Sequence, residues 1–187
     1  YCEYLRRNVF EPLGIGPADL SCQIADIEQH ARGYQPKYSP VGLFLSLMVD
    51  RSLLERTEAG RYRIHPVYMN GPAYGGLIGT ARGFARFLQD QIRARPLAMP
   101  EETRQLFFSS QQNNRGEAIE TTLGWHRGQV AGVPYYGKPG GGPGFQSNLR
   151  VYPSRGIATV WLANQTGVSA GTINRFADEL DRALLDS

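Results

Sequence analysis

The sequence lacks several features that would assign it to a common class. No apolar run among its 187 residues approaches the eighteen or so that a membrane-spanning helix needs, so we predict no membrane span. Cys2 and Cys22 are the only cysteines, too few for a disulfide framework. Two unpaired thiols are the favoured interpretation, and a single bridge between them stays open. The histidines are far apart, without the spacing of zinc ligands, so we predict no metal site.

Lysine is nearly absent. Of the 20 basic residues only Lys37 and Lys138 are lysines, which makes these two candidates for a specific role. The net charge is +3, but the arginines are spread along the chain and form no basic stripe. We therefore predict no nucleic-acid partner. Hydrophobic residues make up 41% and charged residues 20% of the sequence, which is typical of a globular domain.

The first half of the chain has helical periodicity interrupted by loops. The pattern is already in progress at Tyr1, with Leu5 and Val9 on the same side, which suggests a piece of a longer protein. No targeting segment is present from which a compartment could be assigned. Thr80 is expected to cap an amphipathic helix with its apolar side inward. The helices expected in this half cover residues 1–10, 40–55, 80–92 and 100–108.

The second half changes to strand-like runs. Residues 121–127, 133–138, 145–152 and 156–164 are four such runs, and the short turn at 153–156 pairs the last two antiparallel. A helix over 170–185 follows, whose expected buried stripe is Ile173, Phe176, Ala177, Leu180 and Leu184. We expect an α/β fold of the α+β kind: an antiparallel sheet flanked by helices. Residues 1–116 would be its mainly helical and loop region, and 117–187 its strands and terminal helix, within a single unit.

The candidate site is the glycine-rich segment from Tyr136 to Phe145, which reads Tyr-Gly-Lys-Pro-Gly-Gly-Gly-Pro-Gly-Phe. Glycines at a strand edge let a ligand lie against the backbone, and bare N–H groups there can face a developing oxyanion. Lys138 adds a positive charge beside them. A flexible hairpin with an exposed lysine is the alternative.

Several segments, in this order, resemble the C-terminal half of the serine beta-lactamase-like hydrolases, which include class C beta-lactamases, D-alanyl-D-alanine carboxypeptidases and related esterases. The order of the segments carries the resemblance, which leaves out residues 40–66, expected to be a helical insert. The matching segments are Tyr4–Gly14, Ala31-Arg-Gly-Tyr34, Pro72–Ala81, Leu123-Gly-Trp125, Lys138-Pro-Gly140, Pro143-Gly-Phe145 and Trp161–Asn164.

The resemblance implies a beta-lactamase/transpeptidase-like fold whose N-terminal part is missing, and a catalytic role for two residues. Lys138 would hold positive potential near a nucleophile, and the N–H of Gly141 would be one of two oxyanion donors. The resemblance implies no metal and no cofactor. Substrate-binding residues would be Pro139, Gly140, Gly142, Tyr74, Gly75 and Gly76.

Two catalytic motifs of such enzymes are missing at their expected places. No serine is followed by lysine three residues later, so the Ser-x-x-Lys nucleophile is absent. Tyr68-Met69-Asn70 has the letters of Tyr-x-Asn but lies too late in the chain, and we interpret it as a coincidence.

The expected partners are a small acyl substrate (an ester, amide or beta-lactam) and the missing N-terminal part of the same protein. Pro139 stands where beta-lactam enzymes have threonine, which favours an ester or peptide-like substrate. A non-catalytic binding module, or a plain α/β scaffold, is the alternative.

Overall fold

The computed structural model describes residues 1–187 except 41, 42, 44–46, 48, 49, 69, 143, 167–169 and 187. The side chains of residues 51, 56, 58 and 170–173 also lie outside the described part.

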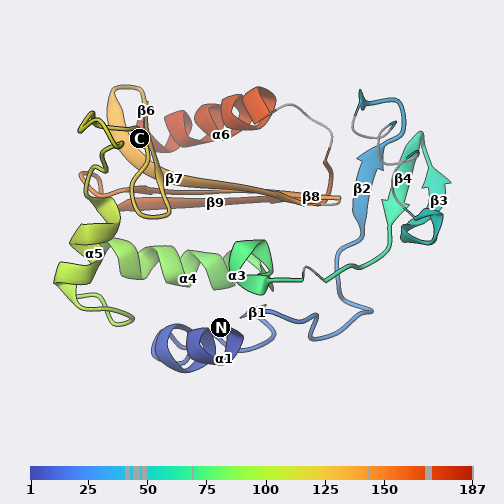
Figure 1. Cartoon of the computed structure of the whole chain (residues 1–187), viewed down its shortest axis with the longest axis horizontal. Coiled ribbons are helices and arrows are strands. Elements are labelled where there is room, and N and C mark those ends of the chain that lie inside the picture. The colour runs from blue at the N-terminus through green and yellow to red at the C-terminus, as the bar shows by residue number, and fades with distance from the viewer. Residues whose placement is uncertain are drawn as a thin grey trace.

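A four-stranded antiparallel sheet lies between two helices. Figure 1 shows α6 (Ala170–Leu185) on one face and α4 (Ala81–Ile92) on the other, with α1 (Cys2–Leu5) beyond α4. The spatial order of the strands follows the chain, β6-β7-β8-β9, so each strand pairs with its neighbour in sequence. The strands are β6 (His126–Val130), β7 (Val133–Gly142), β8 (Phe145–Tyr152) and β9 (Ile157–Ala163). The expected fold class and the pairing of the last two runs are confirmed.

Two strand boundaries differ from the prediction. The first strand begins at His126 rather than Thr121, because Thr122 N–H bonds the Trp125 carbonyl and Gly124, at φ +92°, turns the chain. The second strand does not stop at Lys138. Glycine weakens a strand but does not forbid one, and β7 continues to Gly142 while paired with β8. Lys138 is therefore inside a strand.

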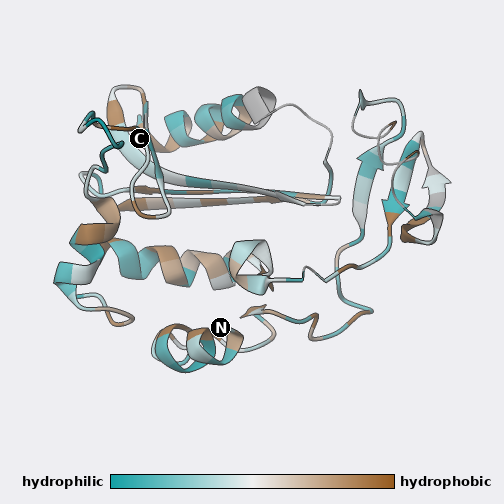
Figure 2. Ribbon diagram, viewed as in Figure 1, coloured by the Kyte–Doolittle hydropathy of each residue, from teal (hydrophilic) through white to brown (hydrophobic). Residues whose placement is uncertain are grey.

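The main core lies between the sheet and α4. Thr80 caps this helix by accepting a hydrogen bond from the Gly83 N–H at 3.1 Å, as predicted. Leu88 on the helix is fully buried against Trp125 and Val151. Figure 2 shows apolar residues on α4, on α5 (Glu101–Phe108) and along the strands that they face.

The buried stripe predicted for the terminal helix is wrong. Ala177 is buried, but Phe176, Leu180 and Leu184 are 56%, 49% and 51% exposed, and the side chain of Ile173 lies outside the described part. A polar contact sets the orientation of the helix instead.

That contact centres on Arg150 of β8, which is 1% exposed. Its Nη1 lies 2.7 Å from Asp178 and 2.9 Å from Asp181 of α6, and its guanidinium stacks 4.4 Å from the Tyr135 ring centroid. The Tyr152 hydroxyl donates to Asp181 at 2.6 Å. Burial, followed by this hydrogen bond, raises the pKa of Tyr152 well above its ordinary value.

The segment expected to be a helical insert contains a hairpin. Strands β3 (Leu54–Glu58) and β4 (Arg61–Ile64) form a small antiparallel sheet with β2 (Gly33–Pro36), in the order β2-β4-β3. Ala59 and Gly60, at φ +46° and +75°, make the two-residue turn that such a hairpin requires. The helical prediction is therefore wrong from Leu54 to Ile64; most of residues 40–50 lie outside the described part, and η2 (Arg51–Leu53) is a 3₁₀ turn.

The N-terminal segment covers the outer side of α4. The helix predicted over residues 1–10 is present as α1 followed by a π-helical turn, η1 (Arg6–Phe10). Cys2 and Cys22 form a disulfide, so the favoured interpretation of two free thiols is wrong and the alternative holds. The bridge ties α1 to the end of β1 (Leu20–Ser21), which pairs with β5 (Ile78–Gly79) ahead of α4. None of the helices in the described part is long and apolar enough to cross a membrane.

Candidate active site

Lys138 lies on the α4 face of the sheet. It pairs across β7 and β8 with Leu149, and paired residues share a face. Leu149 and Tyr136, the latter two residues before Lys138, pack into the cluster around Leu88 of α4. The lysine is exposed, and its ammonium group has no hydrogen-bond or ion-pair partner among the residues that the structure describes. It is therefore free to act on a bound molecule.

The backbone N–H of Gly141 points away from β8. The two-residue turn Ala131–Gly132 makes Val133 exchange hydrogen bonds with Val130 of β6, and in an antiparallel ladder this direction alternates. Odd-numbered residues of β7 thus direct their nitrogens towards β6. Because β6 ends where His126 pairs with Gly137, the nitrogens of Pro139 and Gly141 face an edge of β7 that no strand pairs within the described residues.

Pro139 fits the same geometry. Proline has no N–H, so it is tolerated where a strand needs no ladder bond. Its pairing with Asn148, a residue that bonds Asn174 of α6 at 3.3 Å, places its side chain on the face opposite Lys138. Of the predicted site residues on β7, Lys138, Gly140 and Gly142 share one face, and Pro139 lies on the other.

Ser147 is a candidate that the sequence did not reveal. It pairs with Gly140, and a Cβ at Gly140 would stand 2.4 Å from the Ser147 Oγ. Gly140 therefore leaves room for the hydroxyl, which lies on the same face as Lys138, two residue pairs further along the ladder. Only the register of the β7–β8 hairpin identifies Ser147, and that register could be known only if β7 was expected to extend to Gly142.

The loop of Tyr74, Gly75 and Gly76 lies on the same side of the sheet. It forms α3 (Pro72–Gly75), which Figure 1 shows beside the start of α4, below the part of the sheet that ends in the β7–β8 turn. Gly76 N–H bonds the Pro72 carbonyl at 2.9 Å, and a Cβ on Gly76 would stand 2.6 Å from the Pro72 Cα. Glycine permits this tight wrap. Tyr74 is 89% exposed and presents an aromatic surface.

A network of backbone contacts holds the β7–β8 turn. Tyr34 N–H bonds the carbonyl of Asn164 at 3.0 Å and that of Gly144 at 3.3 Å. Thr166 N–H returns a bond to the Tyr34 carbonyl at 2.8 Å, and the Thr166 hydroxyl accepts from Gly144 N–H at 3.2 Å. The turn that follows Gly141 is thus tied to both β2 and the end of β9.

The remaining candidate groups in the described part add no catalytic group to the β7 edge. The Tyr68 hydroxyl accepts a hydrogen bond from Ile24 N–H at 3.3 Å, and Met69 lies outside the described part. In the described part of the chain, no group of three His, Cys, Asp or Glu side chains could hold a metal ion.

Two cavities lie away from Lys138. One, of about 300 Å³, lies along the outer side of α4, and the other, of about 360 Å³, lies at its C-terminal end. The arrangement offers one cation, one free backbone donor and one hydroxyl on an accessible strand edge.

Comparison with solved structures shows that other proteins share this fold. The chain is similar over its whole length to D-amino acid amidase from Ochrobactrum anthropi SV3 complexed with L-phenylalanine amide, with 18% identity and a TM-score of 0.75. It is also similar, over 88% of its length, to a D-stereospecific amidohydrolase from Streptomyces sp., with 16% identity and a TM-score of 0.57. It covers 53% and 44% of those two chains, so it spans about half the length of the structures it matches.

No curated protein matches the sequence. The profile of the family described as Beta-lactamase matches residues 1–182, nearly the whole chain. The resemblance seen in the ordered segments is therefore confirmed, and the chain belongs to the beta-lactamase family.

Proposed function

We propose that the chain is the C-terminal part of a serine hydrolase that works by acyl transfer. The observation that supports this most is the open edge of β7, where the Gly141 N–H faces no strand and Lys138 has no partner of its own among the described residues. An unpaired N–H on a rigid strand is a group that can stabilise an oxyanion without rearrangement.

The reaction splits into two steps. A serine oxygen attacks the substrate carbonyl, and the negative charge that develops on the carbonyl oxygen accepts a hydrogen bond from Gly141 N–H. The carbon–nitrogen bond of an amide then breaks, and the amine leaves with the proton that the acid/base partner took from the serine hydroxyl. Water repeats the attack on the serine ester and releases the acid. Lys138 favours the charged states of the nucleophile and its acid/base partner.

The nucleophile and its partner come, in this proposal, from a segment outside residues 1–187. The 187 residues contain no Ser-x-x-Lys, and the chain spans about half the length of its structural neighbours. The exposed stripe of Phe176, Leu180 and Leu184 on α6 supports a missing neighbour, since an apolar helix face is normally covered.

The substrate class that we propose is an amide of a small amino acid-like acid. The two structural neighbours described above are an amidase and an amidohydrolase by name. Pro139 offers no hydroxyl for the carboxylate of a beta-lactam. Tyr74 supplies an exposed aromatic surface on the Lys138 side of the sheet.

The test compares the only two lysines. In the full-length protein, Lys138→Gln should lower kcat/KM for D-phenylalanine amide by about 10²–10³-fold, the usual effect of removing one electrostatic contact to a transition state. Lys37→Gln is the matched control: Lys37 lies 5.7 and 5.9 Å from the ring centroids of Tyr38 and Tyr62, on the small sheet, and should have little effect.

Equal activities for the two variants would show that Lys138 is only a surface residue. A full-length protein that binds the amide but never releases ammonia would favour the alternative, a non-catalytic binding module.

A further inference from the structure

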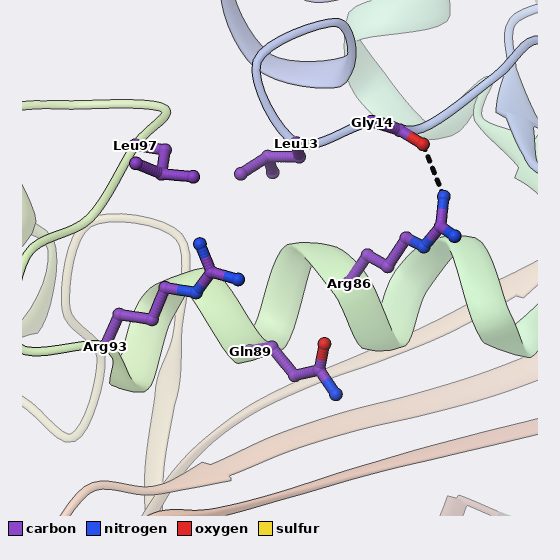
Figure 3. A pocket seen from close by; sticks show the side chains of 6 residues that line it. All are labelled: Leu13, Gly14, Arg86, Gln89, Arg93 and Leu97. Atoms are coloured by element: carbon purple, nitrogen blue, oxygen red, sulfur yellow. Dashed lines mark hydrogen bonds between the residues drawn. The ribbon is translucent and has the colours of Figure 1, made fainter.

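A cavity of about 300 Å³ lies on the outer side of α4, between this helix and the N-terminal segment. The other side of α4 packs against the sheet, so the cavity is separate from the Lys138 edge. An inference about this cavity does not depend on the proposed function. Figure 3 shows it from close by. Its lining residues are Leu13, Gly14, Arg86, Gln89, Arg93 and Leu97.

The cavity carries excess positive charge. Arg86 and Arg93 are seven residues apart, about 10 Å along the helix and on one side of it. Arg86 donates to the Gly14 carbonyl and lies 3.8 Å from Asp19, a carboxylate that Arg82 already binds at 2.9 Å. The guanidinium of Arg93 has no hydrogen-bond or ion-pair partner within the described part of the chain. In Figure 3 it reaches towards Leu13 and Leu97.

The backbone around Arg93 is held firmly. Its N–H bonds the Asp90 carbonyl at 3.4 Å, and its own carbonyl accepts from the Arg104 guanidinium, which also donates to the Gln91 carbonyl at 3.1 Å. The carbonyl end of a helix normally repels anions. Here a cation already neutralises it.

The nearest carboxylate on the helix is also engaged. Asp90 is fully buried and accepts backbone hydrogen bonds from Leu97 at 2.8 Å and Ala98 at 3.2 Å. These bonds fix the loop that carries Leu97 over the cavity. They also leave Asp90 unavailable to Arg93, so the charge of Arg93 faces the cavity uncompensated.

We propose that this cavity binds a small organic anion, a carboxylate with a short alkyl or aryl chain. Guanidinium groups match the planar, two-oxygen geometry of a carboxylate, and Arg93 together with Arg86 would hold it. Leu13 and Leu97 point towards one another on the opposite wall and would cover the apolar chain. The volume is at the lower end of ligand pockets, which restricts the occupant to a small molecule.

The test is an NMR titration of the ¹⁵N-labelled full-length protein with hexanoate. Backbone signals of Gly14, Arg93 and Leu97 should shift and saturate in the millimolar range. Arg93→Gln should weaken binding about tenfold, the usual effect of losing a charge-assisted hydrogen bond. Arg155→Gln is the matched control, because Arg155 is an exposed arginine in the β8–β9 turn.

Further probes test the two halves of the site. Hexanol has the same chain without the charge and should not bind, and Leu97→Asn should weaken hexanoate more than acetate. No saturation with hexanoate in the millimolar range would overturn the proposal, as would an equal effect of Arg155→Gln. Inorganic phosphate binding as tightly as hexanoate would contradict the apolar half of the site.

Discussion

Gly33 and Gly144 meet backbone to backbone. A Cβ on Gly144 would stand 2.6 Å from the Cα of Gly33, and one on Gly33 would stand 3.0 Å from the Cα of Gly144 and 2.7 Å from the Phe145 ring. This contact lets β2 reach the β7–β8 turn and make the hydrogen bonds of Tyr34. The glycine of the Ala31-Arg-Gly-Tyr34 segment thus supports the strand edge that carries Gly141.

Gly33→Ala should therefore destabilise the fold. The added methyl group has backbone on one side and an aromatic ring on the other, and such overpacking costs about 1–3 kcal/mol. Gly16→Ala is the control, because a Cβ there meets nothing within 4 Å and should change stability little. Urea unfolding of the wild type and both variants measures the loss of stability. Equal stabilities would mean that β2 moves away easily.

Tyr152→Phe should change how stability depends on alkaline pH. The folded protein raises the pKa of Tyr152 because burial and the bond to Asp181 favour the neutral phenol. The contribution of this pKa shift to the free energy of unfolding is thus complete below the ordinary tyrosine pKa of about 10 and is lost as pH rises above it. Phenylalanine cannot titrate, so the variant should lose less stability than the wild type over this range.

Thermal unfolding across alkaline pH checks this. At neutral pH the variant should be less stable by about 1 kcal/mol, the usual effect of one lost hydrogen bond. Tyr38→Phe is the control, since Tyr38 is 87% exposed. Parallel pH profiles for wild type and Tyr152→Phe would contradict the assignment.

Ser147→Ala should weaken substrate binding in the full-length protein. The hydroxyl lies beside Gly140 on the face of Lys138, where it can bond a substrate held along β7. We expect kcat/KM for the amide to fall by up to about tenfold, mostly through KM, in keeping with one neutral hydrogen bond. Ser154→Ala, in the β8–β9 turn, should have no effect. An unchanged KM in Ser147→Ala would remove Ser147 from the site.

The strand pairing and α4 could be predicted from the sequence because local signals decide them. A short turn at 153–156 forces β8 and β9 side by side, and Thr80 followed by an apolar stripe defines one helix. The family resemblance rested on several such segments in order. It indicated Lys138 and the glycines without any knowledge of the register.

Features that depend on contacts between residues far apart in the chain could not be predicted from the sequence. The buried face of α6 depends on Arg150, an arginine 31 residues before Asp181 in the chain, and periodicity alone favoured the apolar side. The disulfide required knowing that Cys2 and Cys22 come within 6.1 Å at their Cα atoms. Ser147 required the register that places it opposite Gly140, which depends on glycines continuing a strand.

The central claim is that the Gly141 N–H stabilises the oxyanion, and Gly141→Pro tests it most directly. Proline removes this N–H, and the strand should accept it because Pro139 already occupies the equivalent outward position two residues earlier. Gly141→Ala keeps the N–H and is the control; its Cβ meets only the Phe145 carbonyl, at 3.9 Å.

In the full-length protein, kcat/KM for D-phenylalanine amide should fall about 10²–10³-fold in Gly141→Pro and far less in Gly141→Ala, with both variants folded by circular dichroism. A folded Gly141→Pro variant with the activity of Gly141→Ala would contradict the claim.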